Sequence, residues 1–172
     1  MSGTILALDP ATTTGCCIAR PWMPLSPFTF SIKPPKKVPT LGYYINKIRE
    51  LVDEFEPDYI AWEESYVRNY TSARLQFGIA GIIQGYAETR KATMFAIHPS
   101  SIKKRATGNG RASKDEVVKA ARQAANCRGS ITIRNNDEAD AFWIWVIAHE
   151  QISGDEFRTK DGLSEVVQDV PA

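Results

Sequence analysis

Residues 4–18 read TILALDPATTTGCCI, which is two short apolar runs joined by a turn rich in Thr and Pro. Short apolar runs bounded by turn signals are typical of buried strands. The pattern predicts a β-hairpin whose first strand is central in the sheet and ends at Asp9. Because side chains alternate along a strand, Leu6 and Leu8 are expected on one face of the sheet and Asp9 on the other.

Asp9 is expected where the first strand leaves the core, on a rigid scaffold but within reach of solvent. A carboxylate in that position suits a metal ligand, because hard divalent cations bind fixed oxygen ligands. An Asp before a Pro also starts ordinary turns, so Asp9 alone does not establish a metal site. The interpretation depends on the acids found later in the chain.

The totals fit one globular domain, with 172 residues, 43% of them hydrophobic and 24% charged. The net charge is +1, so no overall basic field indicates a nucleic-acid partner. The charge is uneven, however, because residues 151–172 are acidic and the basic surplus gathers between Lys103 and Arg128. We expect residues 1–150 to form the folded domain and 151–172 to form an acidic tail with little order.

Three cysteines, Cys16, Cys17 and Cys127, indicate reduced thiols and a cytoplasmic location. Their odd number, with two adjacent on an expected buried strand, does not fit a disulfide framework. The first apolar run is too short for a signal peptide and lacks a basic lead. No stretch has the length of a membrane span, so no membrane partner is expected.

The remaining chain alternates between the two hydrophobic periods. Apolar residues at three- and four-residue steps predict helices at 40–55, 72–91, 114–126 and 136–149. Shorter apolar runs predict strands at 58–62 and 93–97, and an edge strand at 28–32 inside a Pro-rich passage. A turn of helix is expected at 100–105 and a loop at 107–111. This order predicts an α/β fold with a mixed central β-sheet flanked by α-helices.

Acids end two of the predicted central strands, at Asp9 and Glu63, and open the most apolar helix, at Asp137 and Asp140. A spacing of three puts the last two on one helix face. Asp137 has an ordinary alternative role, because an acid at a helix N-terminus caps free N–H groups. Asp140 lacks a basic partner on its helix, so a bound cation is its natural neutraliser. Two metals held by such acids would clamp the attacking and leaving oxygens in phosphoryl transfer.

The second strand ends in two adjacent acids, and the residues alone leave the choice between them open. Alternation puts Glu63 on the face opposite Trp62 and Glu64. Alternation therefore favours Glu63 over Glu64 only slightly.

A basic loop surrounds Gly108-Asn109-Gly110. Flexible glycine among clustered cations suits a phosphate backbone, although a solvated charged loop would have the same composition. Beside a carboxylate site, nucleic acid is the better interpretation. The cations of this loop are Lys103, Lys104, Arg105, Arg111 and Lys114.

Four segments of the chain resemble the RuvC family of Holliday-junction resolvases, within the RNase H-like or retroviral integrase superfamily. They are residues 5–10 with Gly15, then 61–66, 107–114 and 137–141. They run in the family's order, at about its separations, and the resemblance extends to about residue 150. The short, divergent chain is similar to the phage-type members.

The resemblance implies an RNase H-like fold and a homodimer that resolves four-way or branched DNA by nicking two strands symmetrically. It implies Mg²⁺ as the cofactor, with Mn²⁺ as a substitute, and a cytoplasmic location, in the host if the protein is phage-encoded. Whether a branch-migration motor is a partner is left open. The implied metal-binding and catalytic acids are Asp9, Glu63, Asp137 and Asp140, and the distance from Glu63 to Gly78 favours Glu63 over Glu64.

The resemblance also implies the DNA contacts. Lys103 and Lys114 match basic residues near the scissile phosphate, Lys114 with a catalytic role, and Tyr66 matches an aromatic that stacks on bases near the crossover. The helix at 72–91, which carries Gly78, Gly81 and Gly85, matches the one beside the dimer interface. The full set of expected DNA-binding residues is Tyr66, Arg68, Lys103, Lys104, Arg105, Arg111 and Lys114.

Three other functions are compatible with parts of the pattern. Actin-like kinases and ATPases also place an acid and a Thr-rich turn after a first strand, but they need further glycine-rich phosphate loops that this chain lacks. An RNase H-like nuclease acting on RNA or unbranched DNA would use the same carboxylates. A non-catalytic junction-binding protein would not need all four acids.

Overall fold

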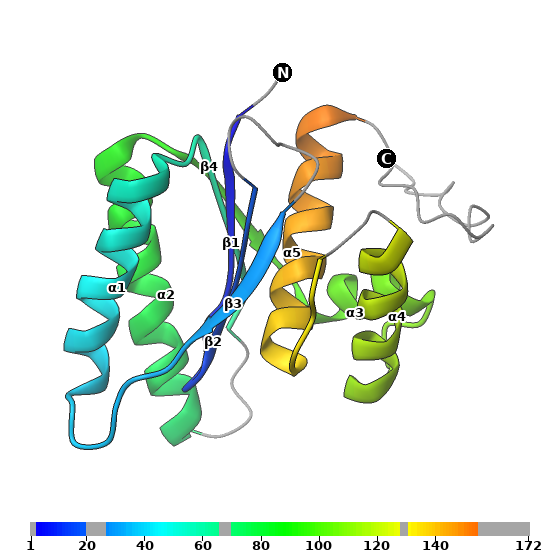
Figure 1. The fold of residues 1–172 in the computed structure, drawn as a ribbon. Coiled ribbons are helices and arrows are strands. Elements are labelled where there is room, and N and C mark those ends of the chain that lie inside the picture. Colours follow the sequence, from blue (N-terminus) through cyan, green and yellow to red (C-terminus); the bar gives the residue numbers. More distant parts are fainter. Residues whose placement is uncertain (1–2, 20–26, 66–69, 128–130, 155–172) are drawn as a thin grey trace.

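A five-stranded mixed sheet forms the centre of the protein (Figure 1). The structure, a computed structural model, describes residues 3–19, 27–65, 70–127 and 131–154. The strand order is β3-β2-β1-β4-β5. β1 pairs antiparallel with β2, which confirms the predicted hairpin, and parallel with β4. The strands are β1 (Ile5–Asp9), β2 (Thr14–Ile18), β3 (Phe28–Ile32), β4 (Tyr59–Glu63) and β5 (Thr93–Ile97).

Helices cover both faces of the sheet (Figure 1). One face carries α1 (Thr40–Phe55) and α2 (Tyr70–Arg90). On the other, α5 (Asn136–Ser153) packs against β1 and β2, and α4 (Lys114–Cys127) and α3 (Pro99–Thr107) pack on α5. The predicted α/β class, with a mixed sheet flanked by helices, is confirmed. Within the described residues, no helix has both the length and the apolar character needed to cross a membrane.

The alternation along β1 divides the core into two clusters. Leu6 and Leu8 are fully buried against α1 and α2, whereas Ala7 is buried under α5. α5 is enclosed almost all round, and its Trp143 and Trp145 are among the largest fully buried side chains. Burial of apolar surface on this scale, at about 25 cal/mol per Å², is the main force that holds the helix on the sheet. The end of β1 is therefore fixed from both faces.

Two helices are longer than predicted by three residues or more. α3 has nine residues where one turn was expected, because His98 caps its N-terminus and Pro99 suits the first helical position. α5 runs to Ser153 and ends at Gly154, in the left-handed conformation that glycine adopts readily. The helix thus includes the first residues of the predicted tail. Residues 155–172 lie outside the described part, so the division of the chain into domain and tail stays a prediction.

β3 is an edge strand, and a buried carboxylate ties it to α5. Glu138 is 2% exposed and accepts hydrogen bonds from Thr29 Oγ1 (3.1 Å) and Ser31 Oγ (3.3 Å). It also accepts from the backbone N–H of Arg134 (2.9 Å). Asn135 Nδ2 donates to Ser31 Oγ at 3.0 Å. A buried carboxylate is tolerated when its oxygens are hydrogen-bonded in this way, so alternate residues of β3 are held facing α5.

Candidate functional site

The carboxyl ends of β1 and β4 bring the first two predicted acids together. The strands are parallel with Leu8 opposite Trp62, so Asp9 and Glu63 follow as neighbours at the same edge of the sheet. Glu63 is half-buried, whereas Glu64 is exposed and uses its backbone N–H to donate to Ile97 O (2.9 Å). The structure therefore places Glu63, and not Glu64, beside Asp9.

Gly15 lets the N-terminus of α5 reach this edge. It is the residue of β2 directly opposite Asp9. A Cβ atom at Gly15 would lie 1.8 Å from the carbonyl oxygen of Asp137, which is far inside van der Waals contact. The helix approaches so closely that only glycine fits. This contact sets Asp137, and Asp140 one turn later, over the end of β1.

Asp137 is not the cap of its helix. The N-cap is Asn135, whose side-chain oxygen accepts the N–H of Glu138 at 2.8 Å. The helix-capping role that Asp137 could have had is thus filled by Asn135. Asp137 and Asp140 are both half-buried on the helix face that meets the sheet edge.

The charges of the other three acids act on Asp9. Burial, and then the charges of Glu63, Asp140 and Asp137, raise the pKa of Asp9 well above its usual value. Burial raises the pKa of Asp140 to about 6 and also raises that of Asp137. Within the described part of the chain, no three His, Cys, Asp or Glu side chains converge on one ion position.

Basic side chains lie beside this acidic edge. Lys114, at the start of α4, lowers the pKa of Asp9, Asp137 and Asp140. Lys103 on α3 lowers the pKa of Asp140, and Lys33, directly after β3, lowers that of Asp137. Lys114 and Lys103 were expected here from the sequence, but Lys33 was not. The available signal was that an edge strand returning parallel to β1 must end at the same edge of the sheet.

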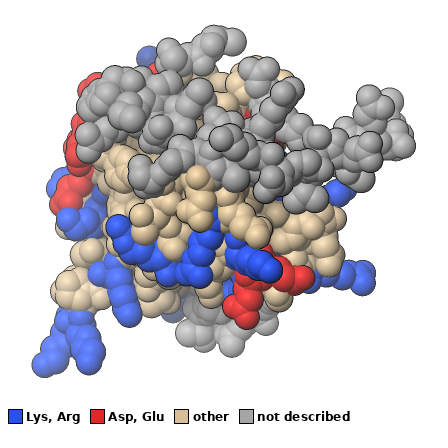
Figure 2. All heavy atoms as spheres, turned by 45° about the vertical axis from the view of Figure 1, so that its right-hand side comes forward, with Lys and Arg blue, Asp and Glu red and all other residues tan. Residues whose placement is uncertain are grey.

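The other predicted DNA-binding residues differ in their surroundings. Arg105 donates to both carboxylate oxygens of Glu150 at 2.7–3.1 Å, and its guanidinium lies 5.6 Å from the centre of the Trp143 ring. It therefore joins α3 to α5. Lys104 and Arg111 are exposed. Tyr66 and Arg68 lie outside the described residues. Figure 2 shows Lys and Arg side chains spread across the middle and lower part of one face, with acidic side chains in small groups.

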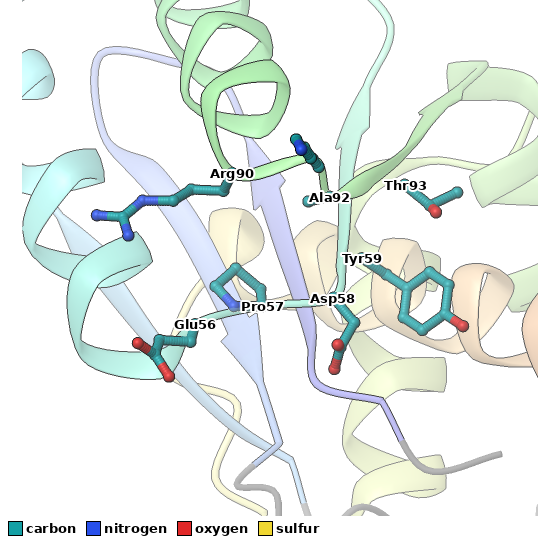
Figure 3. A pocket seen from close by; sticks show the side chains of 8 residues that line it. Glu56, Pro57, Asp58, Tyr59, Arg90, Ala92 and Thr93 are labelled. Atoms are coloured by element: carbon teal, nitrogen blue, oxygen red, sulfur yellow. The ribbon is translucent and has the colours of Figure 1, made fainter.

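A second feature lies away from the acids. A hollow is lined by residues at the starts of β4 and β5 and at the end of α2, among them Tyr59, Thr93 and Arg90 (Figure 3). Because β1, β4 and β5 are parallel, the starts of these strands form the edge opposite Asp9. The hollow is therefore not part of the carboxylate site.

Comparison with known proteins gives one family. The family model described as crossover junction endodeoxyribonuclease RuvC matches residues 33–149. This range includes Glu63, Asp137 and Asp140, but it begins after Asp9. A curated crossover junction endodeoxyribonuclease RuvC from Rickettsia bellii is 35% identical over 100 residues, which is 57% of this chain and 62% of the relative. The chain thus spans less than two thirds of that relative's length.

Solved structures share the fold. The chain resembles Thermus thermophilus RuvC in complex with a Holliday junction substrate, with a TM-score of 0.68 and 20% identity over 87% of this chain and 96% of the other. It also resembles the yeast mitochondrial Holliday junction resolvase Ydc2, with a TM-score of 0.56 and 15% identity over 84% of this chain and 76% of the other. The predicted RNase H-like fold is confirmed by this similarity.

We predict that Gly15→Ala destabilises the protein, because the new methyl group meets a backbone oxygen that cannot turn aside. Overpacking of this kind costs about 1–3 kcal/mol, which lowers the melting temperature by roughly 3–10 °C for a chain of this size. Gly42→Ala is the control, since its added Cβ meets nothing within 4 Å and it lies in a helix. Thermal melts of both variants make the comparison. An unchanged melting temperature for Gly15→Ala would contradict the packing argument.

We also predict that Asp140→Asn stabilises the metal-free protein at neutral pH. The folded-state pKa of about 6 lies above the usual 3.8, so the folded state holds its proton more tightly between these values. Stability therefore falls as pH rises through that window, and the cost, at most about 3 kcal/mol, is complete above it. The variant should melt higher than wild type at about pH 7.5 and equally near pH 4 or below. Glu54→Gln on the exposed face of α1 is the control. If Asp140→Asn still raises the melting temperature near pH 4, the stabilisation does not come from the ionisation of Asp140.

Proposed function

The chain belongs to the RuvC family of crossover junction endodeoxyribonucleases, and from this membership we propose that it is a structure-selective, metal-dependent DNA endonuclease that resolves four-way or branched junctions. One observation carries the proposal: Asp9, Glu63 and the acids of α5 meet at one edge of the sheet, with Lys103 and Lys114 beside them. The solved Thermus thermophilus relative holds a Holliday junction, and we extend that substrate to this chain.

The donor set fits hard divalent cations. The proposed ligands Asp9, Glu63, Asp137 and Asp140 offer only carboxylate oxygens, which is the chemistry that Mg²⁺ and Mn²⁺ bind. Burial first, and then the charges of neighbouring acids, raise the pKa of Asp9 and Asp140, so the ionised carboxylates would be stabilised by bound cations. Divalent cations, when bound, would lower the pKa of the attacking water and neutralise charge on the phosphoryl oxygens. We propose Mg²⁺ as the cofactor, with Mn²⁺ as a substitute.

Lys114 supplies the positive charge of the site itself. Its side chain is exposed, yet it acts on three of the four acids. A cation in that position favours the ionised, ligating form of the carboxylates and stabilises the negative charge that grows on a phosphate during hydrolysis. Lys103 lowers the pKa of Asp140 and would hold the backbone beside the cut. Lys104 and Arg111 would contribute affinity, while Arg105 already bonds to Glu150.

We propose a homodimer, because paired nicks on a nearly twofold junction need two active sites. α2 offers a suitable surface. Phe77 is 50% exposed, and a Cβ at Gly81 or Gly85 would meet nothing within 4 Å. A Cβ at Gly78 would instead lie 2.9 Å from the side chain of Leu41, so this glycine faces α1.

Several finer assignments are also proposals. Tyr66 would stack on bases near the crossover, and Arg68 would contact the backbone beside it, as their positions in the family motif suggest. A phage-type member, which would act in the host cytoplasm, is proposed from the divergence of the chain, which is 35% identical to the Rickettsia bellii relative. Buried free thiols at Cys16 and Cys17 fit that reducing compartment.

The test of the proposed function is a cutting assay on a labelled four-way junction, a duplex of matched sequence and an RNA/DNA hybrid, with and without Mg²⁺. We expect paired nicks in the junction that require the metal. Glu63→Gln should reduce cutting by about a thousandfold or more while junction binding survives. Glu64→Gln, which removes the same charge one residue away, should cut normally.

Other outcomes point to the alternatives. Metal-dependent cutting of the hybrid or duplex in preference to the junction would indicate an RNase H-like nuclease with another substrate. Junction binding without cutting under any metal would indicate a binding protein. If Glu64→Gln fails and Glu63→Gln cuts, the assignment of the second acid is wrong.

A charge placed on the proposed dimer surface should separate the subunits. We predict that Phe77→Asp yields a monomer at micromolar concentration by light scattering, because a carboxylate is costly in an apolar interface. Paired nicks should then become single nicks. Met94→Asp, at a residue 39% exposed on β5, is the control for an added acid at an exposed apolar position. A Phe77→Asp protein that remains a dimer would place the interface elsewhere.

A further inference from the structure

Lys33 places a cation on the β3 side of the carboxylate edge, where the sequence had indicated none. Lys33 follows β3 directly, and the sequence continues Pro34-Pro35-Lys36-Lys37. β3 is antiparallel to β2, which is antiparallel to β1, so β3 ends at the same edge as Asp9. In register, Ser31 lies opposite Gly15, and Gly15 lies opposite Asp9. Lys33 is therefore two residues beyond the level of the acids, two strands away from β1.

The strand also determines the face on which Lys33 lies. Alternate residues of β3 share a face, and the first two on this face, Thr29 and Ser31, bond to Glu138 of α5. The residue before a proline is biased to an extended backbone, so the alternation continues to Lys33. Its side chain thus emerges on the α5 side, next to the helix turn that carries Asp137.

Electrostatics agrees with this placement. Lys33 lowers the pKa of Asp137, and Lys103 lowers that of Asp140. β3 and β5 are the two outermost strands of the sheet. α3, which carries Lys103, follows β5. The two lysines therefore approach the acids from opposite ends of the strand order. Lys33, Lys36 and Lys37 are all exposed, and none has an ion pair among the described residues.

We propose that Lys33, with Lys36 and Lys37, forms a second phosphate-binding flank of the site, so that the bound strand is held on both sides of the acids. This inference rests on the proposed function and adds to it the path of the strand. The acids repel a phosphate backbone, so a strand crossing them needs cations before and after the point of crossing. Lys103 provides one side and Lys33 the other. The two prolines restrict the backbone between Lys33 and Lys36, because their φ angles are fixed.

The first test is the salt dependence of junction binding, measured without divalent cation so that no strand is cut. Each lost phosphate contact should flatten the slope of log K against log salt by about 0.9 and weaken binding by roughly fivefold to tenfold near 0.1 M salt. We expect this for Lys33→Gln. Lys91→Gln is the matched control, because it removes the same charge at the hollow on the opposite edge of the sheet. Lys33 and Lys91 are both exposed, so both variants should keep the wild-type melting temperature.

The second test locates the contact on the DNA. Single phosphates on either side of the cut are replaced by uncharged methylphosphonates, and binding is measured for each substituted junction. Wild type should lose affinity on both sides. Lys33→Gln should become insensitive on one side, and Lys103→Gln on the other. If Lys33→Gln behaves as Lys91→Gln does, or loses sensitivity on the same side as Lys103→Gln, the inference is overturned.

The outcome separates this inference from the proposed function. If wild type cuts junctions and Lys33→Gln binds them as wild type does, only the second flank is refuted. If wild type cuts another nucleic acid instead, the proposed substrate is refuted, and the same measurements on that nucleic acid decide the role of Lys33. If wild type binds no nucleic acid, both fall.

Discussion

The close contact between Gly15 and the first turn of α5 is the constraint on which the site depends. Asp9 and Glu63 are fixed by strand pairing, which is local to the sheet. Asp137 and Asp140 come from a helix that has to be lowered onto the hairpin until backbone meets backbone. The large buried face of α5 supplies the driving force, and the missing side chain of Gly15 removes the obstacle. The packing of α5 in the core thus stabilises an arrangement in which four like charges lie close together.

That proximity has an electrostatic cost, which is the usual trade at an active site. Isolated carboxylates in a half-buried setting resist ionisation, and the raised pKa values of Asp9 and Asp140 record this resistance. Nearby lysines offset part of it. Lys114 lies close enough to act on three acids at once, whereas Lys33 and Lys103 act on one each. The site is therefore neutralised unevenly, with its strongest cation beside the centre and weaker ones towards the two edges of the sheet.

Much of this arrangement was predictable from periodicity. The hairpin, the edge strand, the parity that separates Asp9 from Leu8, and the two apolar faces all follow from the spacing of side chains. Side-chain alternation along the strand favoured Glu63 only weakly. Alternation separates the two faces of the sheet, but only the packed helices show which face carries α5. Arg105 looked like one more loop cation, since its partner Glu150 is 45 residues away in sequence. Glu138 was passed over for a related reason: its partners Thr29 and Ser31 lie more than 100 residues earlier. Long-range pairing of charged groups leaves no periodic trace. Tyr66, Arg68 and the tail after Gly154 lie outside the described residues and stay as predictions.

The bond between Arg105 and Glu150 has a mechanical consequence. It joins the basic helix α3 to the far end of the rod whose other end carries Asp137 and Asp140. Trp143, under the guanidinium of Arg105, fills the space between them. A tilt of α5 would thus carry the cations of α3 along with the acids, so that the two halves of the site keep their alignment while the helix moves. By contrast, β3 and Lys33 are tied near the opposite end of α5 through Glu138. α5 therefore connects both basic flanks of the site. A substitution that loosens its core packing would displace both flanks together.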